Sequence, residues 1–359
     1  MNVGHCHPRL NAIFEDQAKK MMHISPIYLH EYHGQYCKDL CESLGEGFEV
    51  AYLCNSGSEA NDFAHLLARI YTGSEKIISH RKGYHGIAGH AYSLSNCGTW
   101  NPPMPKISNP ELLSYPNLYR NPHQTVDTLV KEAEDHIRAC SNHKIAGLWI
   151  EPVMGVGGVV PMPDGYFKKM ADLTRKYGGL VVSDEVQTGF GRIGKEVWGF
   201  NCHGVKPDIV ITAKAMANGY PMGAVITSKK IMSAWTHNFF NTYGAGVMQC
   251  RLGSEVLKIL KDEKLPENAS EVGSYMLEGF KNAQKKSRKI GNVRGRGMMN
   301  AIELVKDPVT KEPDVETTLN YLEEFKKNGV LMGKAGEEGN VLRCVGSLCI
   351  TKKDTDKVL

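Results

Sequence analysis

The sequence predicts an α/β protein in which a large, mainly parallel sheet is followed by a smaller α+β domain. Between residues 50 and 212, short apolar runs alternate with amphipathic segments of helical period, which is typical of parallel strands buried on both faces. After about residue 253 the helical segments become strongly charged and alternate with further strands. The length of 359 residues agrees with two domains, at about 100–200 residues per domain.

The individual elements follow from periodicity and from helix-start signals. An apolar segment at 50–53 leads into a helix that begins at Ser56, where Glu59 is expected to complete a capping box. The stretch 96–123 is rich in Pro, Asn and Ser and is expected to be a long loop. The other expected helices are 125–140, 166–177, 255–263, 267–287 and 316–327, and the other expected strands are 147–150, 180–182, 209–211, 298–305 and 341–350.

Composition excludes several classes of protein. Hydrophobic residues make up 42% and charged residues 23%, which is typical of a folded globular chain. The net charge of +4 is too small to favour a nucleic-acid binder, and no run approaches the ~18 apolar residues of a membrane span. The ten cysteines form no C-x-x-C pair, so we expect buried thiols in a reducing compartment. We expect no metal site, because His5 and His7 lack a third ligand.

Two residues with distinctive chemistry follow predicted strands. Asp184 comes shortly after the strand at 180–182, and Lys214 shortly after the strand at 209–211. The carboxyl ends of parallel strands meet at one edge of a sheet, where open α/β sheets bind ligands. A lysine in apolar surroundings loses part of its preference for the charged form, which suits a Schiff-base-forming amine. A lysine that simply extends to solvent is the alternative.

Two glycine-containing segments suggest anion or nucleotide binding. Residues 55–59, Asn-Ser-Gly-Ser-Glu, place small residues at a helix N-terminus, which can hold a phosphate, although an ordinary serine cap has the same pattern. Residues 189–194 match G-x-G-x-x-G, but the segment neither directly follows the strand nor opens an amphipathic helix. A nicotinamide-dinucleotide site is therefore disfavoured.

Four motifs then occur in one order along nearly the whole chain: Asn-Ser-Gly-Ser-Glu-Ala-Asn at 55–61, Gly-Tyr-His-Gly at 83–86, Ser-Asp-Glu-Val-Gln-Thr-Gly-Phe-Gly-Arg at 183–192, and Ala-Lys at 213–214. This series resembles the class III pyridoxal-phosphate aminotransferases of fold type I. Within that class, residues 264–273, 293–297 and 349–352 are most similar to the mitochondrial alanine–glyoxylate group.

The resemblance implies a domain layout and an assembly. It implies a short N-terminal segment at 1–35, a large cofactor-binding domain with a seven-stranded sheet at 36–250, and a small domain at 251–359. Relatives would extend beyond this chain at both ends, so its lack of a transit peptide does not bear on its compartment. The resemblance also implies a homodimer or tetramer with active sites at the interface, in the mitochondrial matrix.

The resemblance assigns roles to residues in this sequence. Lys214 would form the aldimine with pyridoxal phosphate and move the substrate's α-proton, while Asp184 would pair with the ring nitrogen. Arg343 would clamp the substrate α-carboxylate. The other implied cofactor contacts are Gly57 and Ser58 at the phosphate, Tyr84 on the ring face with His85 supporting it, Val186 and Gln187 behind the ring, and Thr242 at the phosphate of the partner subunit.

The substrate expectation depends on the residue near that arginine. Val156 stands where ornithine-type relatives carry a glutamate that masks it, so Arg343 is expected to take α-carboxylates. We therefore expect amino transfer from alanine, or a related α- or β-amino acid, to glyoxylate or pyruvate by a ping-pong mechanism. A phospho-lyase acting on a phosphorylated amino alcohol and a weakly active structural paralogue are the alternatives, since Met154, Ala215 and residues 244–251 depart from the family pattern.

Overall fold

A computed structural model describes residues 1–139 and 143–359. The large sheet has seven strands in the order β1-β9-β8-β7-β4-β2-β3, and only β9 runs antiparallel to its neighbours, so the expected mainly parallel sheet is confirmed. Its strands are β1 (Val50–Cys54), β2 (Ile77–His80), β3 (Glu111–Leu113), β4 (Gly147–Ile150), β7 (Leu180–Asp184), β8 (Ile209–Thr212) and β9 (Gly223–Thr227).

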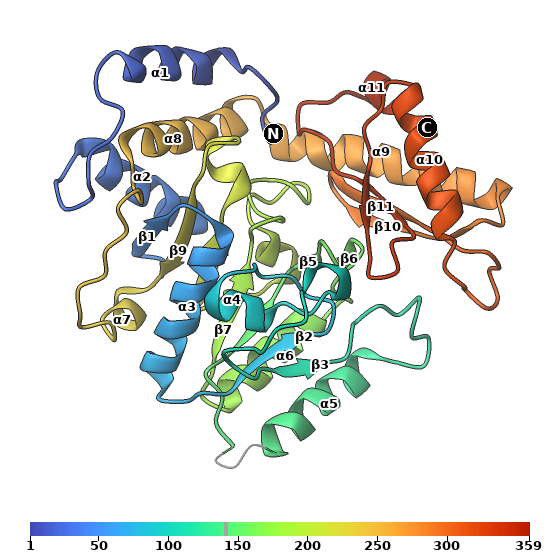
Figure 1. The fold of residues 1–359 in the computed structure, drawn as a ribbon, viewed down its shortest axis with the longest axis horizontal. Coiled ribbons are helices and arrows are strands. Elements are labelled where there is room, and N and C mark those ends of the chain that lie inside the picture. The colour runs from blue at the N-terminus through green and yellow to red at the C-terminus, as the bar shows by residue number, and fades with distance from the viewer. Residues whose placement is uncertain (140–142) are drawn as a thin grey trace.

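Helices cover this sheet and continue into the second domain (Figure 1). The first eight are α1 (Pro8–Ala18), α2 (Glu31–Leu44), α3 (Gly57–Thr72), α4 (Gly89–Leu94), α5 (Val126–Ala139), α6 (Tyr166–Lys176), α7 (Lys229–Met232) and α8 (Val247–Asp262). Cys140, the last residue of the helix expected at 125–140, lies outside the described residues.

The small domain is built on an antiparallel sheet in the order β10-β11-β13-β12. Its elements are α9 (Leu265–Lys286), β10 (Ile290–Arg296), β11 (Met299–Leu304), α10 (Val315–Lys327), β12 (Gly333–Ala335), β13 (Val341–Cys344) and α11 (Lys352–Asp356). A two-stranded hairpin, β5 (Val153–Met154) and β6 (Val160–Pro161), belongs to the large domain and faces this sheet. The expected domain boundary at 250/251 falls within α8 and stays a prediction.

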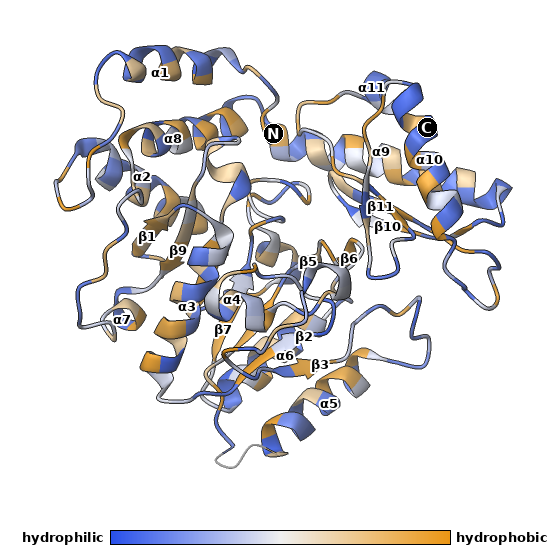
Figure 2. Ribbon diagram, viewed as in Figure 1, coloured by the Kyte–Doolittle hydropathy of each residue, from blue (hydrophilic) through white to orange (hydrophobic). Residues whose placement is uncertain are grey.

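The central strands form because both of their faces are buried. Every residue of β4, β7 and β8 is buried, and Figure 2 shows hydrophobic residues concentrated in the large sheet. Helix α3 packs its apolar face on this sheet through Phe63, Ala64 and Leu67. This packing fixes the carboxyl ends of the strands, where the candidate site lies.

Several expected boundaries were wrong. The strand expected at 341–350 ends at Cys344, because the chain then turns to meet the amino terminus, where Leu348 N–H donates to the Asn2 carbonyl (2.9 Å). Helix α8 begins eight residues earlier than expected, and the long loop contains strand β3. The capping box is half formed: Ser56 accepts from Glu59 N–H (3.2 Å), but the Glu59 carboxylate accepts from Asn55 N–H (3.1 Å) instead of Ser56 N–H.

Candidate active site

A cavity of about 620 Å³ opens at the carboxyl edge of the large sheet. Asp184 is the last residue of β7, and Lys214 begins a short 3-10 helix two residues after β8 ends. The two strands are adjacent and parallel, with Asp184 opposite Ile211, so the expectation that both residues share one sheet edge is confirmed. The cavity is lined by nine of the ten residues singled out from the sequence: Gly57, Ser58, Tyr84, His85, Asp184, Val186, Gln187, Lys214 and Arg343.

Asp184 is a buried carboxylate that contacts three nitrogen atoms, from His85, Asn61 and Val186. Its exposure is 3%, Oδ2 lies 2.7 Å from His85 Nδ1 and accepts from Asn61 Nδ2 (3.1 Å), and Oδ1 accepts from Val186 N–H (3.1 Å). A buried carboxylate needs such partners because desolvation disfavours its charge. The arrangement fixes the Asp184 side chain in one orientation.

The imidazole of His85 contacts the Asp184 carboxylate through Nδ1. Burial lowers the pKa of His85, but the hydrogen bond to Asp184 and the charges of Asp184 and Glu151 outweigh burial, so the net shift of the pKa is upward. His85 Nε2 lies 3.3 Å from Ser79 Oγ. The sequence resemblance implied support of Tyr84 by His85, and the contact between His85 and Asp184 was missed.

Lys214 is reached from the cavity and sits on a strained backbone. Its φ is +46°, a conformation that costs a residue with a side chain on the order of 1 kcal/mol or more. Burial by surrounding protein lowers the pKa of Lys214, Asp184 raises it and Arg343 lowers it, with a net downward shift. A larger share of neutral amine is available at neutral pH as a result, which is the condition for a nucleophilic lysine.

The amino end of α3 forms a cradle for an anion. Ser56 caps the amide of Glu59, and its carbonyl accepts from Ala60 N–H (3.1 Å). Gly57 and Ser58 line the cavity, and their amides belong to the first turn of the helix, where backbone N–H groups have no partner within the helix. Gly86 packs against this turn with φ +125°, and a Cβ there would lie 2.3 Å from Ser58 Oγ. The backbone therefore approaches the cradle at a distance that only glycine permits.

Arg343 reaches the cavity from β13 of the small domain. Its Nη2 donates to Gln187 Oε1 (2.5 Å), while Nε is buried without a hydrogen-bond partner among the described residues. Burial lowers the pKa of this guanidinium and the charge of Glu151 opposes the shift. Arginine stays charged under all ordinary conditions, so the site presents an incompletely paired cation.

Thr242 is the one predicted site residue that does not line this cavity. It is exposed, in the loop between α7 and α8, and its neighbour Tyr243 is 62% exposed. Asn241 ties this loop to the α3 cradle, because its side chain donates to Glu59 Oε2 (2.7 Å) and accepts from Asn55 Nδ2 (2.9 Å).

Three further polar residues organise the site and had no role assigned from the sequence. Asn61 bridges Asp184 and the indole of Trp149, whose Nε1 donates to Asn61 Oδ1 (3.0 Å). Glu151 accepts from the N–H groups of Tyr84 (3.1 Å) and Gly155 (2.9 Å). Asn2 accepts from Arg192 Nη2 (2.7 Å) at the cavity wall. A polar residue within the apolar face of α3 was the available signal for Asn61.

These residues fit pyridoxal phosphate. The α3 cradle offers the amides of a helix N-terminus to a phosphate, and the buried Asp184 carboxylate is suited to a protonated ring nitrogen. The Lys214 amine shares the cavity with both. Among residues 1–139 and 143–359 no group of three or more His, Cys, Asp or Glu side chains is arranged to hold a metal ion, and no helix is both long and apolar enough to cross a membrane.

Comparison with known proteins gives a consistent picture. A family model described as class-III aminotransferase matches residues 1–359. The chain is 37% identical to human mitochondrial alanine–glyoxylate aminotransferase 2, covering 99% of the chain and 74% of the relative, and 38% identical to a mitochondrial homologue of that enzyme from Arabidopsis thaliana, covering 99% and 75%. It is 32% identical to an ethanolamine-phosphate phospho-lyase homologue from Caenorhabditis elegans, covering 98% and 80%.

A solved structure agrees with these sequence matches. The crystal structure of an amine transaminase from an uncultivated Pseudomonas species, in its pyridoxal-phosphate-bound form, superimposes with a TM-score of 0.93 at 28% identity, covering 99% of this chain and 86% of that one.

Proposed function

Because the chain belongs to the class III aminotransferase family and is a pyridoxal-phosphate enzyme, we propose that it transfers an amino group from alanine, or a related α- or β-amino acid, to glyoxylate or pyruvate. The observation that carries this proposal is the state of Arg343. Its hydrogen bond goes to the neutral Gln187, its Nε is unpaired within the described residues, and the nearby hairpin turn carries Val156 rather than an acid. A guanidinium in this state supports recognition of a substrate carboxylate by a bidentate pair.

The proposed roles follow from where the side chains lie. The bound cofactor supplies an electron sink next to the substrate's α-carbon. Asp184 holds a proton at the cofactor's ring nitrogen, and the α3 cradle holds the phosphate. Lys214 Nζ takes the proton from the α-carbon and later returns it, for which its lowered pKa is suited. Arg343 orients the substrate by its carboxylate, so that the α-proton faces Lys214.

A half-reaction screen tests the proposal. The cofactor-loaded protein is mixed in separate cuvettes with alanine, β-aminoisobutyrate, ornithine and phosphoethanolamine, and the visible cofactor absorbance is followed. We expect alanine to bleach the absorbance with release of pyruvate, and glyoxylate then to restore it with release of glycine. Phosphate release from phosphoethanolamine without a keto acid would favour the phospho-lyase function that the Caenorhabditis relative's name suggests. No change with any amine would indicate a structural paralogue.

We further propose that the active form is a homodimer, or a tetramer built from two such dimers, with Thr242 serving the partner's phosphate site. The exposed Thr242 lies outside the cavity of its own subunit, and the large apolar side chains of Phe239, Phe240 and Tyr243 are exposed beside it. An exposed apolar cluster of this kind favours a protein interface.

Mixing two damaged variants tests this assembly. Lys214→Ala and Thr242→Val are each expected to show little activity at limiting cofactor. If Thr242 serves the partner, the mixed dimer contains one site with both residues intact, and activity returns on mixing. Activity that stays at the level of the separate variants, or a monomer by light scattering, would contradict the proposal.

The names of the relatives also support a mitochondrial location for this enzyme, which we propose as its compartment. Fractionation of cells that produce the protein tests this, with co-sedimentation with matrix markers as the expected result and a purely cytosolic signal as the contradicting one.

A further inference from the structure

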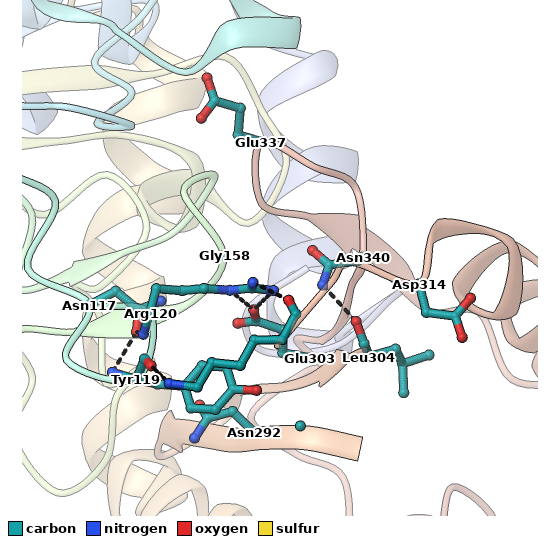
Figure 3. Close-up of polar contacts among 12 residues, drawn as sticks. Asn117, Tyr119, Arg120, Gly158, Asn292, Glu303, Leu304, Asp314, Glu337 and Asn340 are labelled. Carbon is teal, nitrogen blue, oxygen red and sulfur yellow. Dashed lines mark hydrogen bonds and ion pairs between the residues drawn. The ribbon is translucent and has the colours of Figure 1, made fainter. Parts of the chain in front are cut away.

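A buried carboxylate lies between two arginines at the junction of the two domains. Glu303, on β11, is 2% exposed, and Figure 3 shows Asn117, Tyr119 and Arg120 on one side of it and Leu304 and Asn340 on the other. Its Oε1 is paired with Arg120 and its Oε2 with Arg294. Burying a charge is unfavourable unless it is paired and hydrogen-bonded, so these three side chains depend on one another.

The three side chains join the two domains. Arg120 belongs to the segment between β3 and α5 of the large domain, and besides Glu303 it donates to the carbonyl of Lys311 in the small domain (2.5 Å). Arg294, on β10, donates back to the large domain through Nε and Nη2 to the carbonyl of Gly158 (3.0 and 2.6 Å). We call Arg120, Glu303 and Arg294 the interdomain triad. It attaches the small sheet both to the 114–124 segment and to the β5–β6 hairpin.

Two further contacts near the triad also join the two domains. Gly336 N–H donates to the carbonyl of Val156 (3.0 Å), and Lys82 Nζ lies 2.9 Å from Glu337 Oε2. Gly336, Lys82 and Glu337 line an interdomain cleft of about 510 Å³, which the triad residues also line. These contacts attach the small domain to the large domain at points other than the triad itself.

The strand that carries Glu303 also places Arg343. β11 pairs with β13 so that Ala301 lies opposite Arg343 and Glu303 opposite Val341. Residues two apart on a strand point to the same face, and so do residues directly opposite each other on neighbouring strands. Glu303 and Arg343 thus project from the same face of the small sheet, one register step apart. A shift of β11 relative to the large domain would move Arg343 with it.

The other end of the hairpin contacts Arg343's partner. Gly155 packs so closely on Gln187 that a Cβ at this position would lie 2.4 Å from Oε1, the atom that accepts from Arg343. Arg294 holds the same hairpin at Gly158. The triad therefore connects to both members of the Arg343–Gln187 pair, to one through β11 and β13 and to the other through the 155–158 turn.

From this arrangement we propose that Glu303 is a positioning residue for substrate recognition, which sets the placement of Arg343 in the cavity through the interdomain triad. This inference rests on the proposed role of Arg343 as the carboxylate-binding residue. Glu303 does not line the cavity and makes no contact with substrate or cofactor in this scheme. Its loss should therefore weaken carboxylate binding more than the chemical step.

The main test compares Glu303→Gln with Glu312→Gln. Glutamine preserves the size of Glu303 but removes the charge that both arginines share, whereas Glu312 is a 57% exposed glutamate of the same domain, paired with Lys306. For Glu303→Gln we expect the KM for alanine and the inhibition constant of propionate to rise about tenfold, the effect of weakening one charge-assisted interaction. We expect kcat to stay within about threefold, because the geometry of Lys214 and Asp184 does not depend on the triad. The control should match the parent enzyme.

A readout that does not depend on activity comes from hydrogen exchange of the cofactor-free protein. Peptides covering β13, at 341–344, should exchange faster in Glu303→Gln than in Glu312→Gln. If Glu303→Gln does not fold, Arg120→Lys is used in its place, since it retains the positive charge and loses the planar fork. A fall in kcat with unchanged KM and unchanged propionate inhibition would overturn the proposal, whichever variant is used.

Arg343→Leu distinguishes the role of Arg343 from the role of Glu303. If this variant leaves the KM for alanine unchanged, Arg343 does not bind the substrate carboxylate, and Glu303 has no such residue to position. If Arg343→Leu raises that KM and the triad variants do not, the positioning role of Glu303 alone is wrong.

Discussion

Asn61 offers a sharp test of how the site is held together. It is 1% exposed, it donates to Asp184 Oδ2 (3.1 Å) and to the Gly57 carbonyl (3.0 Å), and it accepts from Trp149 Nε1 (3.0 Å). Asn61→Leu has a similar volume and removes all three interactions. The chain then keeps a buried carboxylate with one donor fewer and a buried indole N–H without an acceptor.

The expected magnitude follows from these contacts. An unsatisfied buried donor costs about 1–3 kcal/mol, and a lost hydrogen bond to a charged group costs about 1.5–3 kcal/mol. Burial of the leucine side chain offsets about 1–2 kcal/mol of this. We therefore expect Asn61→Leu to lower the free energy of unfolding of the cofactor-free protein by about 2–4 kcal/mol. Because Asp184 loses its fixed orientation, the Kd for pyridoxal phosphate should rise about tenfold or more.

Two assays measure these effects. Urea denaturation of the cofactor-free protein gives the stability change, and titration with pyridoxal phosphate followed by absorbance gives the Kd. Asn282→Leu is the matched control, because Asn282 is an exposed asparagine near the carboxyl end of helix α9. Asn61→Asp keeps the acceptor for Trp149 but places a second carboxyl beside Asp184, so it should also weaken cofactor binding. An Asn61→Leu protein with native stability and a Kd within twofold of the parent would show that Asn61 does not hold Asp184 in place.

Three further predictions concern His65, Gly86 and Lys214. His65 is fully buried, neither ring nitrogen has a partner among the described residues, and burial lowers its pKa to about 3. The unfolded chain therefore binds the proton more tightly, so the free energy of unfolding falls as the pH drops below about 6.5. In urea titrations, His65→Leu should remove about 2 kcal/mol of the stability that the parent loses between pH 7.5 and 5, and an unchanged pH dependence would contradict this. Gly86→Ala places a Cβ against Ser58 at a residue with a left-handed φ. In an absorbance titration, this variant should raise the Kd for pyridoxal phosphate at least about tenfold. An unaltered Kd would show that the cradle does not need this close approach. In the cofactor-free protein the lowered pKa of Lys214 should make it react with limiting trinitrobenzenesulfonate at a lower pH than the surface lysines, as followed by peptide mass; equal labelling of all lysines would argue against a desolvated amine.

The local sequence pattern was sufficient to predict the strands whose carboxyl ends carry the candidate site. The apolar runs at 147–150, 180–182 and 209–211 each became a strand, and the polar residues that follow two of them supplied Asp184 and Lys214 to one cavity. Strand ends are set by short-range signals, and parallel strands share a direction, so this part of the site is readable from a single sequence.

The contacts that orient these side chains were not predictable in the same way. Arg120 meets Glu303 across 183 residues, and Asn2 meets Arg192 across 190. No periodicity connects such partners, because each pairing depends on how distant segments of the chain pack against one another. The antiparallel strand β9 was missed for a related reason, since its place between β1 and β8 is a property of the sheet order.

Peptide mapping shows whether Lys214 is the amine that reacts with the cofactor in this cavity. Cofactor-loaded protein is reduced with borohydride, digested and analysed by mass spectrometry for a lysine that carries the reduced cofactor. We expect the modification on Lys214 in the parent protein, and its absence, together with loss of the visible absorbance, in Lys214→Ala. A modification on another lysine, or visible absorbance and turnover that survive in Lys214→Ala, would contradict it.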